Sequence, residues 1–290
     1  MTKEIRKPWD FLDEYRGKEF SGEWPTVPEM FSITVSRFPD RPCFTDFEEK
    51  DGSKQTLSYR QVNEKVIALA SWMKRNGVEK GDRIAVSGKN SPEWGTVFLA
   101  GLFAGAVVCP MDYALHEKEL ENLLSTAKPK FFFIDEEKYK HFSGGTHDFK
   151  VYSLNPKIPE TYVYGLQAEP CVDLHVNVED DLAVILFTSG TTGTPKGVML
   201  THKNLVSDTY IAQTRMYLNE KDVFYALLPI HHAYTMQAVF IESLSVGAEI
   251  VYGKSMAVTR LMKELKEGQI TMLLGVPLLF NKLLAGIMKG

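Results

Sequence analysis

Residues 182–197 read Leu-Ala-Val-Ile-Leu-Phe-Thr-Ser-Gly-Thr-Thr-Gly-Thr-Pro-Lys-Gly, and this stretch decides the fold class. Its apolar first half is too short for a typical helix and predicts a strand buried on both faces of a parallel sheet. Its second half is a loop of glycines and hydroxyl side chains that ends in Lys196 and contains no acidic residue. Gly190 and Gly193 permit turns that aim successive backbone N–H groups at one point. The loop therefore predicts a binding site for a phosphate chain.

The spacing of this loop disfavours two common nucleotide-binding motifs. A Walker loop requires Gly-x-x-x-x-Gly-Lys followed by Ser or Thr. Here Pro195 stands where the second glycine would be, and Lys196 is followed by Gly197. The Gly-x-Gly-x-x-Gly pattern of Rossmann domains does not occur in the loop either. The loop is thus a phosphate-binding loop of another kind.

The run 188–197 resembles the signature loop of the adenylate-forming enzymes, a family of acyl-CoA synthetases, peptide-synthetase adenylation domains and luciferases. Other stretches between roughly residues 20 and 290 are similar to segments of the same family: 26–31, 38–42, 57–62, 101–112, 201–205 and 228–234. The lead-in at 26–42 is most similar to that of long-chain fatty-acid–CoA ligases. The chain is identified as a member of this family, similar to its N-terminal part.

The resemblance implies a reaction and its participants. The family joins a carboxylate to AMP from ATP, releases pyrophosphate and passes the acyl group to coenzyme A. It therefore implies ATP, Mg²⁺ and coenzyme A, with a fatty acid as the expected acid. The residues expected to bind the phosphates are Thr188, Ser189, Gly190, Thr191, Thr192, Gly193 and Lys196, and those expected to be catalytic are Thr188, Lys196 and His232.

The stretch 228–234 reads Leu-Pro-Ile-His-His-Ala-Tyr and is similar to the family's Leu-Pro-x-x-His-x-Tyr, which lies beside the bound carboxylate. A neutral histidine can donate to a carboxylate oxygen, and a tyrosine offers an apolar wall with a polar tip. His232 and Tyr234 are therefore the expected substrate-binding residues, with two structural aromatics at a strand end as the alternative. We expect no metal site at His231 and His232, because adjacent residues on an extended chain point apart.

The chain departs from the family pattern in its length. The resemblance leads us to expect about as many residues again, with a Tyr-Gly-x-Thr-Glu loop, a ribose-binding Asp, a hinge and a small C-terminal domain that carries a catalytic lysine. None of these motifs occurs in the sequence. We therefore expect an N-terminal fragment with little catalysis of its own, and the Mg²⁺ ligand in the part that is missing.

Composition narrows the remaining function classes. The 290 residues include 33 basic and 37 acidic side chains, for a net charge of −4. There is no basic stripe typical of nucleic-acid binding and no polybasic tail typical of a membrane surface. Cys43, Cys109 and Cys171 lie far apart, which favours a reducing cytoplasm, and the charged first residues are not a signal peptide. The uncharged run 94–111 predicts a buried helix and strand rather than a membrane span, since glycines interrupt it and Pro110 ends it.

Strand and helix patterns alternate along most of the chain. Strands are predicted at 84–86, 107–109, 130–134, 150–154, 182–187, 198–200, 223–228, 249–252 and 271–274. One helix is predicted from the capping box Ser58/Gln61 to Gly77, and a second begins after Asn90 or Ser91. Further helices are predicted at 117–127, 203–217, 235–246, 258–266 and 277–288. Residues 141–180 are expected to form a surface connection. The alternation predicts an α/β fold with mostly parallel sheets in α/β/α layers.

The resemblance divides this fold into two lobes. Residues 65–215 are expected to form the first sheet lobe, and 1–64 with 216–290 to form part of the second, with the active site between them at the carboxyl ends of strands. Two roles are open for the apolar stripe of Met236, Gln237 and Phe240: lining an acyl channel or packing in the core. Packing in the core is favoured.

Two other functions stay open. One is an amino-acid adenylation domain, which the absence of an acidic residue at 231–235 disfavours. The other is a non-catalytic nucleotide-binding module.

Overall fold

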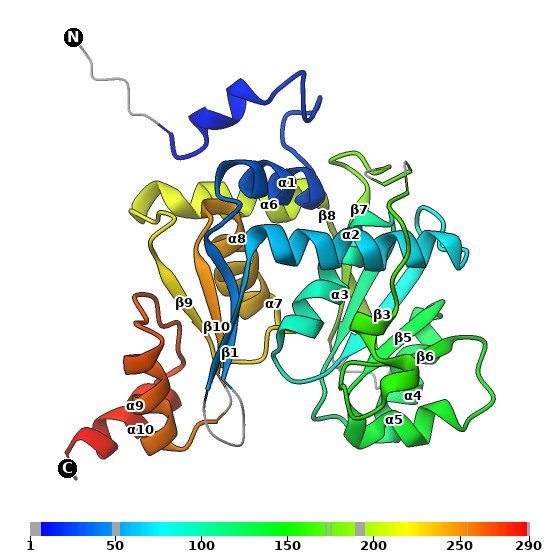
Figure 1. Ribbon diagram of the computed structural model, residues 1–290. Coiled ribbons are helices and arrows are strands. Elements are labelled where there is room, and N and C mark those ends of the chain that lie inside the picture. Colours follow the sequence, from blue (N-terminus) through cyan, green and yellow to red (C-terminus); the bar gives the residue numbers. More distant parts are fainter. Residues whose placement is uncertain are drawn as a thin grey trace.

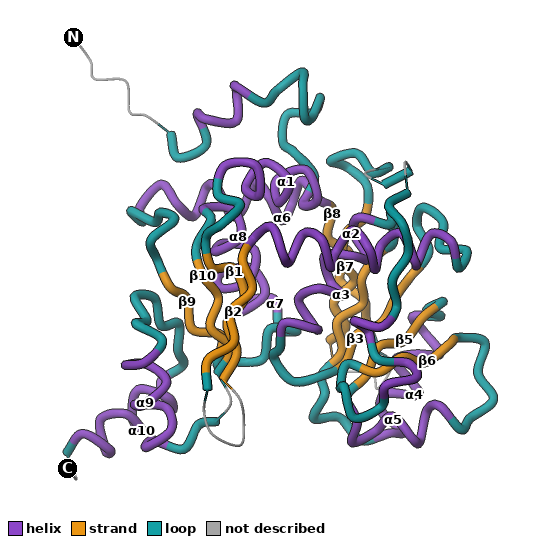
Figure 2. The backbone as a smooth tube through the Cα atoms, in the orientation of Figure 1, coloured by secondary structure: helices purple, strands orange, loops and turns teal. Residues whose placement is uncertain are grey.

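The computed structural model describes residues 7–47, 53–171, 173–174, 176–188, 195–253 and 255–288. They form two sheets with helices between and around them (Figure 1). A six-stranded sheet has the order β6-β5-β3-β4-β7-β8, and a four-stranded sheet has the order β2-β1-β10-β9. Figure 2 shows the two sheets as separate groups of strands with helices between them. The predicted α/β architecture with mostly parallel sheets is confirmed.

The elements have the following bounds. The strands are β1 (Pro42–Phe47), β2 (Lys54–Ser58), β3 (Arg83–Ser87), β4 (Val107–Met111), β5 (Phe131–Ile134), β6 (Lys150–Ser153), β7 (Leu182–Thr188), β8 (Lys196–Thr201), β9 (Val223–Ala226) and β10 (Glu249–Tyr252). The helices are α1 (Val27–Arg37), α2 (Tyr59–Arg75), α3 (Pro92–Phe103), α4 (Glu117–Ala127), α5 (Glu136–Ser143), α6 (His202–Ala212), α7 (Ala233–Thr235), the π-helix η5 (Met236–Ile241), α8 (Glu242–Val246), α9 (Val258–Glu267) and α10 (Pro277–Ile287). Short 3-10 helices are η1 (Asp10–Glu14), η2 (Pro159–Thr161), η3 (Val163–Gly165) and η4 (Gln213–Arg215).

In the large sheet, β3 pairs in parallel with β4 and β5, β4 pairs in parallel with β7, and β8 pairs antiparallel with β7. The strand predicted at 182–187 is therefore β7, which continues one residue further to Thr188, and its central residues are buried. In the small sheet, β1 and β9 both run parallel to β10, while β2 pairs antiparallel with β1. The carboxyl ends of β4 and β7 consequently lie at one edge of the large sheet.

Helix α3 packs against both sheets, and two glycines permit this. A Cβ atom at Gly95 would lie 2.7 Å from the Tyr252 hydroxyl of β10, and a Cβ atom at Gly101 would overlap Ile84 of β3. The same helix and β4 make up most of the uncharged run 94–111, which is a buried helix followed by a buried strand, as predicted. Among the described residues, no helix is both long and apolar enough to cross a membrane.

The capping box predicted at the start of the first long helix is present. Ser58 is the N-cap of α2, its side chain accepts from the Gln61 N–H, and the Gln61 side chain accepts from the Ser58 N–H. Ser91, rather than Asn90, caps α3, with Pro92 at the first helical position. This leaves the Asn90 side chain available for other contacts.

Several element predictions were wrong. Residues 271–274 form a single bridge between Met272 and Phe224 instead of a strand. Backbone bonds join Met272 to Val223 and Tyr225 at this bridge, while the Val223 N–H bonds the Thr271 hydroxyl instead of a carbonyl. The helix predicted at 203–217 ends earlier, at Ala212, and continues only as η4. The predicted connection 141–180 contains the strand predicted at 150–154, which is β6, and also the end of α5 and the short helices η2 and η3, which were not predicted.

The helix predicted at 235–246 consists of α7, η5 and α8. Met236 and Phe240 are buried in the core, as favoured by the sequence. The Gln237 amide donates to the Leu205 carbonyl and the Thr209 hydroxyl of α6. The division of the chain into lobes 65–215 and 1–64 with 216–290 stays a prediction.

His202 at the start of α6 is fully buried, and its Nδ1 accepts from the Val27 N–H of α1 at 3.2 Å. Its Nε2 lies 3.1 Å from the Asn177 side-chain amide. Burial lowers the pKa of His202 to about 4, with Asp181 acting in the opposite direction and Lys80 in the same one. Neutral imidazole is the form that this site holds, because a protonated ring would turn the Nδ1 acceptor into a second donor.

We therefore expect the free energy of unfolding to fall as the pH drops from about 6.5 to about 4, because the unfolded chain then binds a proton that the folded chain excludes. This shift in the pKa of His202 corresponds to about 3 kcal/mol of folding stability. That stability is fully present above the pKa of the histidine in the unfolded chain, and it is lost as the pH falls through the pKa in the folded chain. Urea unfolding at a series of pH values measures it. His202→Asn keeps an acceptor near Nδ1 but does not titrate, so its curve is expected to be flatter than wild type over this range. Exposed His141→Asn is the matched control, and a His202→Asn curve parallel to wild type would contradict the assignment.

Candidate functional site

A cavity of about 780 Å³ opens at the carboxyl edge of the large sheet. Strand β4 contributes Met111 and the residue after it, Asp112, while β7 contributes Phe187 and Thr188. The loop after β9 of the small sheet contributes His231 and His232. Parallel strands bring their carboxyl ends to one edge, where open α/β sheets usually bind ligands. The cavity thus collects residues from three separate parts of the sequence.

The β7–β8 hairpin presents the two ends of the predicted phosphate loop. Thr188, the last residue of β7, is the register partner of Lys196, the first residue of β8, and both are exposed. Thr188 and Pro195 line the cavity. The antiparallel pairing therefore holds the loop's two ends side by side at the cavity wall. Five predicted phosphate-binding residues lie outside the described residues: Ser189, Gly190, Thr191, Thr192 and Gly193.

The two predicted substrate-binding residues differ in their position relative to the cavity. His232 lines the cavity and is exposed. Tyr234, in the short helix α7, is 55% exposed. The structure thus brings His232 together with Thr188, while Tyr234 lies largely in solvent.

Asn90 holds the loop that carries the two histidines. Its side-chain amide donates to the carbonyls of Ala226 and Leu228, at 2.9 and 2.8 Å. Its carbonyl oxygen accepts from the Ile230 N–H at 3.0 Å. The residue is buried, so these bonds are shielded from water. The sequence suggested Asn90 only as a possible helix cap, and no local pattern indicates a partner so far along the chain.

His231 is buried on the cavity wall, with 7% of its surface exposed. Burial and the neighbouring His232 lower the pKa of His231 to about 4, although Asp112 acts in the opposite direction. Its Nε2 lies 3.4 Å from Asp112 Oδ1 but makes no hydrogen bond with any described residue. The Nε2 of His231 is therefore buried opposite the Asp112 carboxylate, with no hydrogen bond to a described residue.

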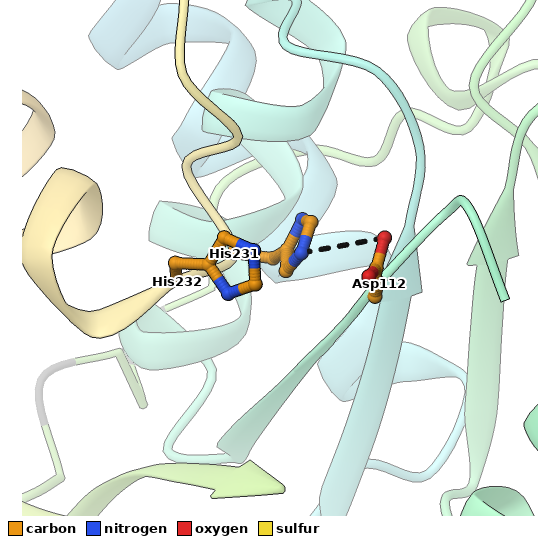
Figure 3. A group of neighbouring side chains, drawn as sticks. All are labelled: Asp112, His231 and His232. Carbon is orange, nitrogen blue, oxygen red and sulfur yellow. Dashed lines mark ion pairs between the residues drawn. The ribbon is translucent and has the colours of Figure 1, made fainter. Parts of the chain in front are cut away.

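The expectation that His231 and His232 point apart was wrong. The two residues lie in a turn rather than on an extended chain, and their ring centroids are 4.1 Å apart. Asp112 faces them from the end of β4 (Figure 3). One donor atom of each of these three residues lies within 4.8 Å of the others. No sequence pattern indicated this cluster, because Asp112 and the histidines are far apart along the chain.

Comparison with known proteins identifies relatives along nearly the whole chain. The model of a family described as AMP-binding enzyme matches residues 31–289. The 4-coumarate–CoA ligase CCL1 of Humulus lupulus is 30% identical over an alignment of 262 residues that covers 84% of this chain and 46% of that ligase. The long-chain-fatty-acid–CoA ligase of Bacillus subtilis (strain 168) is 26% identical over 318 residues, covering 96% of this chain and 55% of that ligase. The chain spans about half the length of these relatives.

Solved structures share the fold. The N-terminal subdomain of NpsA from Klebsiella oxytoca, in complex with 3-hydroxybenzoyl-AMSN, matches with a TM-score of 0.71 at 25% identity, over 86% of this chain and 59% of that one. Apo MatB from Rhodopseudomonas palustris matches with a TM-score of 0.76 at 24% identity, over 90% of this chain and 51% of that one. The second likeness is evidence of fold alone.

Proposed function

This chain belongs to the family of AMP-binding enzymes, and from that premise we propose that it serves the ATP-dependent activation of a carboxylic acid. In the proposed reaction the acid is joined to AMP, pyrophosphate leaves, and the acyl group passes to the thiol of coenzyme A. The observation that carries the proposal is the shared cavity of Thr188 and His232. One belongs to the phosphate loop and the other to the acid-binding segment, so the cavity brings the two reactants together.

Each residue has a proposed role in the first step. Carboxylate and triphosphate repel one another, so their approach requires donors and cations aimed at both. Thr188, Lys196 and the loop between them bind the β- and γ-phosphates and guide pyrophosphate out. His232 donates to a carboxylate oxygen of the acid. Mg²⁺ would arrive with ATP and neutralise part of the phosphate charge, and the exposed hydroxyl and ammonium groups at the loop's ends fit such a phosphate chain.

We propose a fatty acid as the substrate, in a cytoplasmic enzyme. The lead-in segment and the likeness to the Bacillus subtilis ligase support the fatty acid. The absence of disulfides among Cys43, Cys109 and Cys171 fits a reducing compartment. A second candidate is an amino acid, because the Asp112 carboxylate on the cavity wall is an acidic group that could pair with an ammonium.

Carboxylate-dependent ATP–pyrophosphate exchange tests this proposal, using the full-length product of the gene and a panel of fatty, aromatic and amino acids. Exchange that depends on one class of acid would support adenylation and identify the substrate. Exchange with amino acids alone would favour the second candidate. ATP binding without exchange for any acid would overturn the proposal in favour of a nucleotide-binding module.

His232→Ala is expected to raise the KM for the acid by about ten- to a hundredfold, since a hydrogen bond to a charged group contributes about 1.5–3 kcal/mol. The KM for ATP should change little, because His232 is proposed to contact the acid and not the phosphates. Exchange rates measured at varied acid and then at varied ATP concentration give the KM for each substrate separately. His141→Ala, which removes an exposed imidazole near Glu121, serves as the control. An unchanged KM for the acid in His232→Ala would leave the residue a structural role only.

A further inference from the structure

We propose that Asp112, His231 and His232 form a binding site for a divalent transition-metal ion, with Zn²⁺ as the preferred ion. The residues come from two elements: Asp112 follows β4, and the histidines lie in the loop between β9 and α7. Two imidazoles and one carboxylate are the donor set that zinc takes in open, three-ligand sites. Mg²⁺ and Ca²⁺ prefer all-oxygen ligands, so they are expected to bind poorly here.

The buried imidazole of His231 is the strongest sign of a ligand. Its Nε2 is buried and makes no hydrogen bond with any described residue, although Asp112 Oδ1 is only 3.4 Å away. Such an orphaned polar atom costs about 1–3 kcal/mol. A metal ion between the ring and the carboxylate would give both groups a partner at once.

The distances fit a site that closes by a small movement. The three donor atoms lie within 4.8 Å of one another. Zn–N and Zn–O bonds of about 2.0–2.2 Å place the donors of a tetrahedral site about 3.3–3.6 Å apart. The donors must therefore approach by about 1 Å, and the exposed His232 and the partly exposed Asp112 are free to turn toward the buried ring.

The surroundings allow an ion to enter and leave one coordination position open. All three residues line the same cavity, which opens to solvent. Asn90 holds the histidine loop through three hydrogen bonds, so the two imidazoles stay together without the ion. With three protein ligands, the fourth position of a tetrahedral ion faces the cavity. If the proposed function holds, the ion occupies the place of the acid's carboxylate and inhibits activation competitively.

Zinc binding to the tag-free chain tests the site without any assay of activity. Titration against a chromophoric zinc chelator is expected to show one ion bound with a micromolar or lower Kd. Asp112→Asn and His232→Ala should each weaken binding at least tenfold, and both change partly or fully exposed side chains, so folding should persist. His141→Ala is the matched control, because it removes an imidazole that also lies beside a carboxylate, at 2.7 Å from Glu121, and it should bind zinc like wild type.

Cobalt substitution identifies the ligands. Co²⁺ in the site should show the intense visible bands of a tetrahedral ion without a thiolate charge-transfer band, which excludes Cys171 as a ligand. Equal zinc affinity in wild type, Asp112→Asn and His232→Ala would overturn the inference, as would the absence of a stoichiometric site. Neither result bears on the proposed function, whose test is acid-dependent exchange with Mg²⁺ and a zinc-selective chelator present.

Discussion

Lys196→Ala is expected to reduce kcat/KM for ATP in the proposed carboxylate-dependent ATP–pyrophosphate exchange by about 10²- to 10³-fold, the range seen when one preorganised group that stabilises transition-state charge is removed. Lys196 is the first residue of β8 and pairs with Thr188 across the hairpin. Its ammonium group is the cationic end of the predicted phosphate loop. In the proposed reaction, negative charge develops on the departing pyrophosphate, so loss of the lysine charge is expected to affect the transition state more than the bound substrate.

Two further variants make this result specific. Lys196→Arg keeps the charge on a longer side chain and should recover part of the activity. Lys263→Ala removes an exposed lysine of α9 that pairs with Glu267, far from the hairpin in sequence, and should change the rate by less than about twofold. Wild-type kinetics in Lys196→Ala would show that the loop does not bind the phosphates.

Trp94→Ala is expected to lower the free energy of unfolding by about 3–5 kcal/mol, the largest effect on stability that we predict. The Trp94 side chain is fully buried at the start of α3. It stacks on Phe98 at 5.4 Å and meets the edge of Phe240 at 5.8 Å. Its removal leaves a cavity in the layer that joins the two sheets. Urea or thermal unfolding followed by far-UV circular dichroism measures the loss.

Trp94→Phe provides the matched comparison. It keeps an aromatic ring but removes the indole Nε1, which is buried without a hydrogen-bond partner among the described residues. The smaller ring loses some packing, while the unpaired donor disappears, so the two effects oppose one another. We expect less than half the loss seen for Trp94→Ala. Equal losses in the two variants would show that the phenyl ring recovers none of the packing of the indole, and would contradict the prediction.

Local sequence patterns predicted the elements that are determined by local chemistry. The helix that begins with the Ser58/Gln61 capping box and the strand β7 are both present. Strand β10 has the predicted bounds. In each case the signal is a cap or a short apolar run, which depends only on residues that are close in sequence. The strand predicted at 271–274 is only a single bridge, because its pairing with β9 does not continue past Met272, and a pattern of hydrophobicity does not record where pairing stops.

The site was less predictable, because its contacts join distant residues. The loop and the His232 segment were found from motifs, and the structure places Thr188 and His232 on one cavity. Asn90 was considered only as a helix cap, yet its side chain bonds Ala226, Leu228 and Ile230. Asp112 ends the stretch 101–112 that is similar to the family, but nothing in the sequence indicated its contact with His231, which depends on the meeting of β4 with the β9 loop. Such contacts follow from topology, which local patterns do not determine.

The pairing of β1 with β10 also sets the order in which the chain can fold. The strands of the large sheet all lie between Arg83 and Thr201, so this sheet can close while the rest of the chain is still being synthesised. Strand β1 ends at Phe47, but its parallel partner does not begin until Glu249. Until then one edge of β1 and the face of α3 around Gly95 lack their partners. Contacts so distant in sequence form slowly and expose apolar surface to aggregation, so a nascent chain has its greatest need of chaperones in this interval.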